Sequence, residues 1–186
     1  ADLAAELLAS PGPVQVTRQE AGVPGWDVSA AGRPLGYLAS TWQVAGSVGY
    51  SGRPLDVLVA ISPTGRITGA KLMQHNEPVL TLGISDADIA AYVSGFSGYD
   101  LTAPAGTGLR QPGVPDVISR ATVSTGVIRD GILRTARTLA IGRGVIAAGG
   151  GIDRLTYTAT DWPGLLAQGA LAEVQVSMTQ AATALA

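Results

Sequence analysis

The chain has 186 residues, with 12 lysines and arginines, 14 aspartates and glutamates and one histidine, which gives a net charge of −2. That length suits a domain with its own core, and a hydrophobic content of 46 % excludes an intrinsically disordered chain. The absence of cysteine excludes disulfides, iron–sulfur clusters and a thiol nucleophile within the chain. The near-neutral charge argues against a nucleic-acid partner, because phosphate contacts require clustered cations.

The first 34 residues are expected to form a short helix and a loop-rich lead-in. Three leucines lie on one side of a helix over residues 2–9, and Pro11-Gly12-Pro13 ends it. Glycines and a proline then mark residues 14–34 as loop.

Residues 35–74 carry the signals of an antiparallel sheet. A β-prone run from Leu35 to about Val48 precedes a second run over 55–61, whose apolar residues alternate between two faces. Ser62-Pro63-Thr64-Gly65 is a strong turn that returns the chain into a third run over 66–74. We therefore expect a meander of adjacent strands, with 55–61 as a central strand covered on both faces.

Helices and a late strand complete the predicted fold. Ser85 and the acidic residues after it indicate a helix start, and apolar residues at helical spacing predict a long helix over 123–141. Trp162-Pro163 begins a short helix, and the alternation over 173–178 predicts a half-buried strand that joins the sheet. The predicted fold class is α+β, with an antiparallel β-meander sheet packed with helices.

Two stretches carry the residue types from which a site could be built. His75, the only histidine, and Glu77 lie together where a β-run ends, and turn chemistry alone is the simpler interpretation of this edge. The second stretch, 116–125, enters the long helix, where unpaired N–H groups and a partial positive charge favour an anion. A cap formed by Ser119 or Thr122 is the simpler interpretation there. The residues alone leave these alternatives open.

The order of these features resembles the FMN-binding domain family, whose hallmark is a Ser/Thr-Gly-Ala-Thr/Ser motif that carries FMN through a phosphoester on its last hydroxyl. The matching run is Ser119-Arg120-Ala121-Thr122, preceded by His75-Asn76-Glu77-Pro78 and Gly83-Ile84. Within the family, the chain is most similar to the extracytoplasmic domain of NosR/NirI-type membrane flavoproteins. The resemblance covers about residues 35–178 and leaves 179–186 as a tail leading to a membrane segment.

The resemblance implies FMN attached covalently to Thr122, transferred from FAD by a magnesium-dependent, ApbE-type flavin transferase. Thr122 would then be a modification acceptor, and the flavin would carry electrons without independent substrate turnover by the domain. The full-length protein would add membrane helices and iron–sulfur modules, and would support nitrous oxide reductase from the periplasmic side of a bacterial inner membrane. The implied cofactor environment consists of His75, Glu77, Gly83, Ile84, Asp116, Ser119, Arg120, Ala121 and Val123.

Arg120 stands where the family usually has glycine. Arginine matches a phosphate in geometry and charge and could pair with that of the flavin; it could also prevent recognition by the transferase. Two other functions stay open beside the electron carrier, namely a non-redox sensor or regulatory ligand-binding domain and a structural interaction module. We further expect His75 and Glu77 to lie close to Thr122 in the fold.

Overall fold

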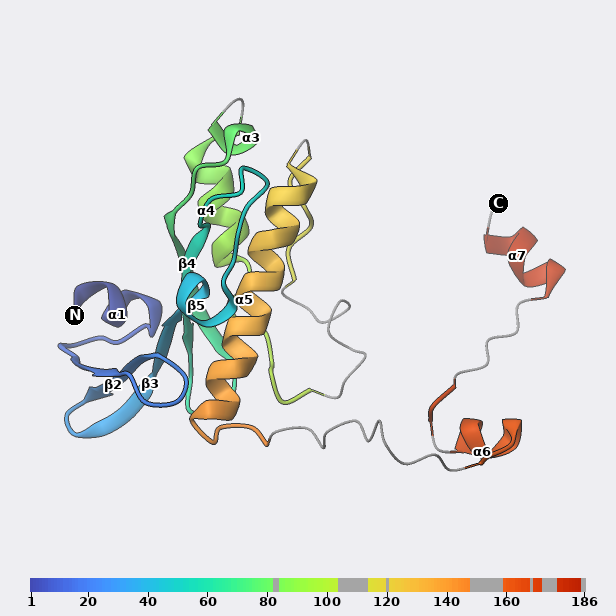
Figure 1. Ribbon diagram of the computed structural model, residues 1–186, viewed down its shortest axis with the longest axis horizontal. Coiled ribbons are helices and arrows are strands. Elements are labelled where there is room, and N and C mark those ends of the chain that lie inside the picture. Colours follow the sequence, from blue (N-terminus) through green and yellow to red (C-terminus); the bar gives the residue numbers. More distant parts are fainter. Residues whose placement is uncertain are drawn as a thin grey trace. The chain divides into compact units, whose positions relative to one another are not determined.

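The computed structural model describes residues 1–81, 84–103, 114–119, 121–147, 159–167, 169–171 and 177–184. The chain divides into two compact units, Ala1–Ala148 and Gly149–Ala186, and the first contains the sheet (Figure 1). None of the helices in the described ranges combines the length and the apolar character that crossing a membrane requires.

The first unit is built on a five-stranded sheet in which each strand pairs antiparallel with the next along the chain (Figure 1). The strands are β1 (Gln15–Gln19), β2 (Gly25–Ala30), β3 (Arg33–Ser40), β4 (Asp56–Ile61) and β5 (Ile67–Gln74). This arrangement confirms the predicted α+β meander. β4 is covered on both faces as expected, because Val57 and Val59 lie in one hydrophobic core and Ala60 lies in another.

The β4–β5 hairpin closes through the predicted turn. Ser62 donates its N–H to the Arg66 carbonyl oxygen at 2.8 Å. Gly65 has a φ of +80°, a left-handed conformation that glycine adopts without a steric penalty. Ile61 and Ile67 are thereby paired across the two strands.

Helices cover both faces of the sheet. α1 (Asp2–Leu7) packs on one face, where Leu7 joins the core around Ala60. α4 (Asp86–Ser94) and α5 (Thr122–Gly142) pack on the other face, over a core that includes the fully buried Phe96 and Leu139. α4 begins at the predicted Ser85, which forms a capping box with Asp88.

The loop-rich interpretation of residues 14–34 is wrong, because β1 and β2 form there. β1 is an edge strand with exposed side chains along nearly its whole length, so it lacks the apolar alternation that identifies a strand. Arg143, at the end of α5, binds the β1–β2 hairpin. It donates Nε–H to Asp27 Oδ1 at 2.7 Å and Nη1–H to the Val23 carbonyl oxygen at 2.9 Å.

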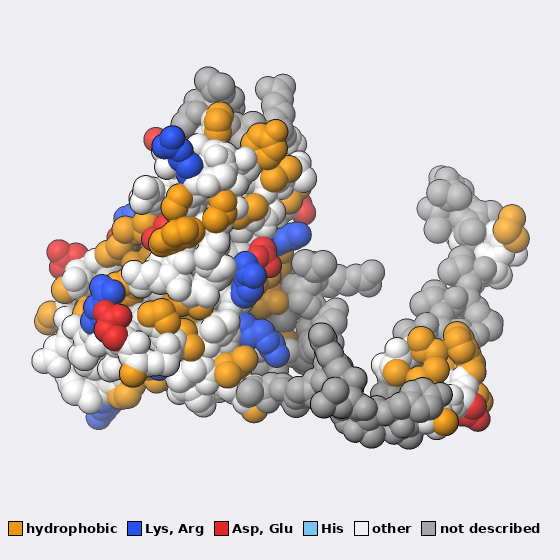
Figure 2. All heavy atoms as spheres, viewed as in Figure 1, with side chains coloured by type: hydrophobic (Ala, Val, Ile, Leu, Met, Phe, Trp, Pro, Cys, Tyr) orange, Lys and Arg blue, Asp and Glu red, His pale blue; other side chains and the backbone are white. Residues whose placement is uncertain are grey.

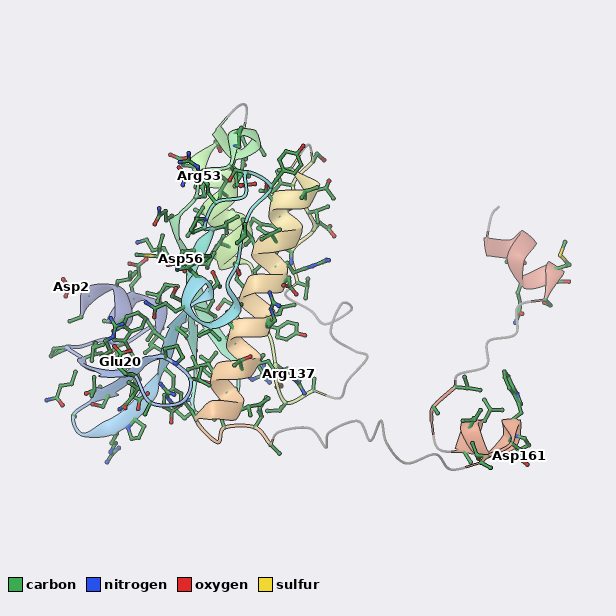
Figure 3. All side chains as sticks on the ribbon, viewed as in Figure 1. Asp2, Glu20, Arg53, Asp56, Arg137 and Asp161 are labelled. Carbon is green, nitrogen blue, oxygen red and sulfur yellow. The ribbon has the colours of Figure 1, made fainter. Side chains whose placement is uncertain are left out.

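The β-run expected from Leu35 to about Val48 stops at Ser40, where α2 (Thr41–Ala45) begins. Ser40 Oγ accepts a hydrogen bond from Gln43 N–H at 3.2 Å and donates one to Asp56 Oδ1, the residue labelled in Figure 3, at 2.6 Å. Gly46 ends the helix with a φ of +60°. A capping serine followed by a left-handed glycine was therefore the overlooked helix signal.

The second unit contains, among its described residues, α6 (Trp162–Ala167) and α7 (Met178–Ala184). α6 agrees with the helix expected at Trp162-Pro163. The strand expected over 173–178 falls mostly outside the described residues, at 173–176, and Met178 begins a helix instead. Ser177 Oγ accepts the Gln180 N–H at 3.2 Å and Gln180 Oε1 accepts the Ser177 N–H at 2.9 Å, a capping box that favours this helix start.

Candidate functional site

Glu77 is a buried carboxylate between the end of β5 and the short helix α3 (Pro78–Thr81), with only 1 % of its surface exposed. Its Oε2 accepts hydrogen bonds from the Tyr50 N–H at 3.0 Å and the Ser124 hydroxyl at 2.6 Å. Its Oε1 accepts one from the Ser51 N–H at 3.1 Å. One side chain thereby connects the segment after β5, the loop after α2 and the first turn of α5.

The pKa of the Glu77 carboxyl lies below its usual value of 4.5. Burial acts against this, because the charged form loses hydration and the pKa would rise. The hydrogen bonds from Ser124, Ser51 and Tyr50 stabilise the carboxylate and outweigh the cost of burial. The partial positive charge at the start of α5 favours the same form, so Glu77 is ionised at neutral pH.

The hydroxyl groups around the start of α5 differ sharply in exposure. Ser124 and Thr125 are 0 % exposed. Ser124 donates to Glu77, and Thr125 donates to the Ala121 carbonyl oxygen at 2.8 Å. Ser119 and Thr122 are exposed, and Thr122 is the first residue of the helix.

α5 begins without a side-chain cap. Ala121 occupies the N-cap position, so the interpretation in which Ser119 or Thr122 caps this helix is wrong. The Thr125 N–H bonds to the Ala121 carbonyl oxygen, and the three N–H groups before it have no partner within the helix. This helix start therefore offers donors and a partial positive charge to an oxyanion next to the Thr122 hydroxyl.

A shallow hollow of about 570 Å³ lies beside Thr122, between α5 and the residues that follow α2. Ser47 lines it and is 4 % exposed, and its hydroxyl has no hydrogen-bond partner among the described residues. Val48 and Val123 expose 44 % and 58 % of their surface, and Figure 2 shows hydrophobic side chains at the surface over the first turns of α5. Among the residues that the structure describes, the lining consists of Gly46, Ser47, Val48, Thr122, Val123, Gly126, Val127, Asp130 and Arg134.

His75 lies in a different hollow. A space of about 800 Å³ runs between β5 and α4, with His75, Lys71 and Asp86 among its lining residues. His75 Nδ1 accepts the Glu77 N–H at 3.3 Å, so the histidine supports the backbone at Glu77. The structure thus brings Glu77 to the start of α5, whereas the lining of the histidine's hollow does not include Thr122.

The other predicted site residues are spread around α4 and α5. Asp116 is exposed before the helix, and Ala121 is buried at its N-cap position. Ile84 is half-buried against the main core. Gly83 and Arg120 lie outside the described residues. The roles of all these residues toward a cofactor stay predictions.

The loop after α2 carries site residues that sequence reasoning missed. Tyr50 and Ser51 bind Glu77 through backbone N–H groups, which no pattern of side-chain types reveals. The loop closes through the Gly49 N–H and the carbonyl oxygen of Arg53, the latter labelled in Figure 3, at 3.0 Å. Gly49 makes room for the carboxylate, because a Cβ at this position would clash with Glu77 Oε1.

Gly49→Ala should therefore destabilise the first unit, by about 1–3 kcal/mol, because the added methyl group displaces the carboxylate from its donors. Gly12→Ala is the matched control, since a Cβ at Gly12 would meet nothing within 4 Å. Unfolding in urea measures both changes. Equal stability of the two variants would show that Glu77 is not held at the distance the structure gives.

Fold and site together define the class of protein: an α+β domain in which an exposed threonine opens an uncapped helix beside a buried glutamate. The sequence model of the FMN-binding domain family matches residues 49–136, a stretch that begins at the Glu77-bound loop and includes Thr122. The chain therefore contains a domain of the FMN-binding domain family.

Three curated proteins are similar to this chain over a longer stretch. Protein NirI of Paracoccus denitrificans (strain Pd 1222) is 57 % identical over 186 residues, which is 100 % of this chain and 27 % of the relative. Proteins named Regulatory protein NosR, from Pseudomonas aeruginosa and Stutzerimonas stutzeri, are 31 % and 26 % identical over 156 residues, or 78 % of this chain and 22 % of each relative. The chain thus spans about a quarter of the length of the curated relatives it matches.

Proposed function

We propose that the domain carries FMN as an electron-transfer group, linked through a phosphoester to Thr122. The family match supports the cofactor. The linkage rests on one observation: Thr122 is exposed at the start of α5, whereas Ser124 and Thr125 in the same turn are 0 % exposed. A transferase can form a phosphoester only on a hydroxyl that it can reach, which favours Thr122 over Ser124 and Thr125.

The described residues fit the chemistry of FMN. The first-turn N–H groups of α5 and the helix dipole would stabilise the phosphate. The unpartnered hydroxyl of Ser47 suits a polar group, and Val48 and Val123 would contact apolar ring surface in the adjoining hollow. When bound, FMN supplies reversible electron transfer, and the protein binds and orients it.

The proposal also covers how FMN is attached and where the domain lies in the cell. An ApbE-type flavin transferase would move FMN from FAD to Thr122 with Mg²⁺. The domain would lie on the periplasmic side of a bacterial inner membrane, within a longer protein that adds membrane helices and iron–sulfur modules and supports nitrous oxide reduction. The similarity to one stretch of the much longer NirI and NosR proteins supports this setting.

Co-expression with an active flavin transferase tests the proposal. We expect the intact mass to increase by one phosphoester-linked FMN, together with a visible flavin absorbance that survives acid precipitation. Expression without the transferase is the control and should give the unmodified mass. A chain that stays unmodified beside an active transferase would contradict the covalent linkage and make Arg120 the first residue to replace by glycine.

A regulatory domain that binds a ligand reversibly is the second candidate, favoured by the fact that two relatives are named Regulatory protein NosR. This alternative predicts that the unmodified chain binds FMN and that acid precipitation releases it. A structural interaction module would bind no flavin in either experiment.

A further inference from the structure

We propose that Glu77 is a positioning residue, which builds the flavin attachment site by joining the loop 49–51 to the first turn of α5. We call this set of hydrogen bonds the Glu77 latch. The inference rests on the proposed function and goes beyond it, because it gives Glu77 an indirect role. The family resemblance by itself placed Glu77 in the environment of the cofactor.

The carboxylate of Glu77 is fully engaged by protein donors. Oε2 accepts from the Tyr50 N–H and the Ser124 hydroxyl, and Oε1 accepts from the Ser51 N–H, all at 2.6–3.1 Å. With 1 % of its surface exposed, the side chain offers almost no area to a ligand attached at Thr122. Glu77 therefore acts through the residues that it holds.

The Glu77 latch fixes two sides of the attachment site. On one side it holds Tyr50 and Ser51, which lie two and three residues after Val48 at the rim of the hollow. On the other side it holds Ser124, in the same helical turn as Thr122. No other side chain in the described ranges hydrogen-bonds to both this loop and this turn.

The latch also bears on which hydroxyl remains free. The Ser124 hydroxyl is buried and donates to the carboxylate, so it is not presented to solvent. Thr122 is the hydroxyl left exposed within the first turn of α5. Ser124 thus points inward to the carboxylate, while Thr122 in the same turn is exposed.

Glu77→Gln tests the latch, because the amide keeps the shape of the side chain but turns one acceptor oxygen into an NH₂ group that faces N–H donors. Tyr92→Phe is the matched control. It removes another buried hydrogen bond at the start of α5, from the Tyr92 hydroxyl to the Thr125 carbonyl oxygen at 2.8 Å, without touching the loop.

Amide hydrogen exchange of the unmodified protein gives the first measurement. Exchange at Tyr50 and Ser51 should become about tenfold faster or more in Glu77→Gln, because both amides lose a charged acceptor, and should stay at the wild-type rate in Tyr92→Phe. Wild-type exchange in Glu77→Gln, or unprotected amides at both positions in the wild type, would overturn the proposal.

Flavin loading by the transferase gives the second measurement, at a temperature where every variant is folded. Glu77→Gln should load about 10–100-fold more slowly, because small displacements of a reacting group reduce rates on that scale, whereas Tyr92→Phe should load normally. If Glu77→Gln does not fold, Ser124→Ala removes only the helix end of the latch and should still slow loading. Wild-type loading of the folded variant would overturn the proposal.

The two proposals can fail separately, because hydrogen exchange needs no flavin. A wild-type chain that takes up no flavin overturns the proposed function, and the exchange rates at Tyr50 and Ser51 then still decide whether Glu77 holds the loop.

Discussion

The Thr122→Val variant is expected to take up no covalent flavin at all. Valine keeps the branched shape of threonine and removes the acceptor oxygen. Thr122 is exposed and does not cap α5, so the free energy of unfolding should change by less than about 0.5 kcal/mol. Intact mass after co-expression with the transferase, together with a thermal melt, measures both effects.

Ser119→Ala is the matched control for this loss. Ser119 is exposed and belongs to the same four-residue motif, yet it lies before the helix and its hydroxyl is not the proposed acceptor, so its variant should still carry covalent flavin. Peptide mapping of the loaded wild type should place the flavin on the peptide that contains Thr122. Covalent flavin in Thr122→Val would refute the assignment, and its loss in Ser119→Ala alone would move the linkage to Ser119.

Glu77→Ala is expected to lower the free energy of unfolding by about 3–5 kcal/mol at neutral pH. The truncation leaves three donors without their acceptor in a buried place: the Tyr50 N–H, the Ser51 N–H and the Ser124 hydroxyl. Denaturant unfolding of the wild type and the variant measures the difference. A loss of unfolding free energy below about 0.5 kcal/mol is typical of a substitution at the surface. That result would mean that water replaces the carboxylate as the acceptor of these hydrogen bonds.

The contribution of Glu77 should depend on pH in a defined direction. Because its folded-state pKa lies below the usual 4.5, the carboxylate adds stability that is fully present above that pH and is lost as the pH falls through the folded-state pKa. Glu77→Gln cannot titrate, so its stability deficit should shrink as the pH falls through that window. Hydrogen bonds from Thr102 also lower the pKa of Asp100. Asp100 is present in both proteins, so its contribution to the pH dependence cancels in the difference between them. A deficit that is constant with pH would contradict the lowered pKa.

The elements that could be predicted from the sequence are those whose own residues carry the signal. β4 alternates between two cores, α4 has a serine cap, and α5 has a continuous apolar stripe. β1 could not be predicted, because an exposed edge strand needs no apolar face. α2 has only five residues, too few to show a helical period, and it interrupts a run that is β-prone by composition.

Part of the candidate site could also be predicted from the sequence. The motif indicated that Thr122 lies at the start of the long helix, as it does. Of the prediction that His75 and Glu77 lie close to Thr122, the part on Glu77 agrees with its bond to Ser124 in the same turn, whereas His75 lines a separate hollow. The partners of Glu77 in the loop after α2 could not be predicted, since they are backbone groups positioned by tertiary packing. The same holds for the burial of Ser124 and for the separate hollow around His75.

The hydrogen bond between Glu77 and Ser124 spans 47 positions of the chain, whereas every strand of the sheet pairs with its sequence neighbour. Contacts between near neighbours close short loops and can form early in folding, while distant contacts carry a larger entropic cost and follow later. The geometry around Thr122 is therefore complete only after α5 has docked, and a short peptide with the same four-residue motif lacks it. A transferase that recognises this geometry would act after folding, so that bound flavin would distinguish mature chains from nascent or misfolded ones.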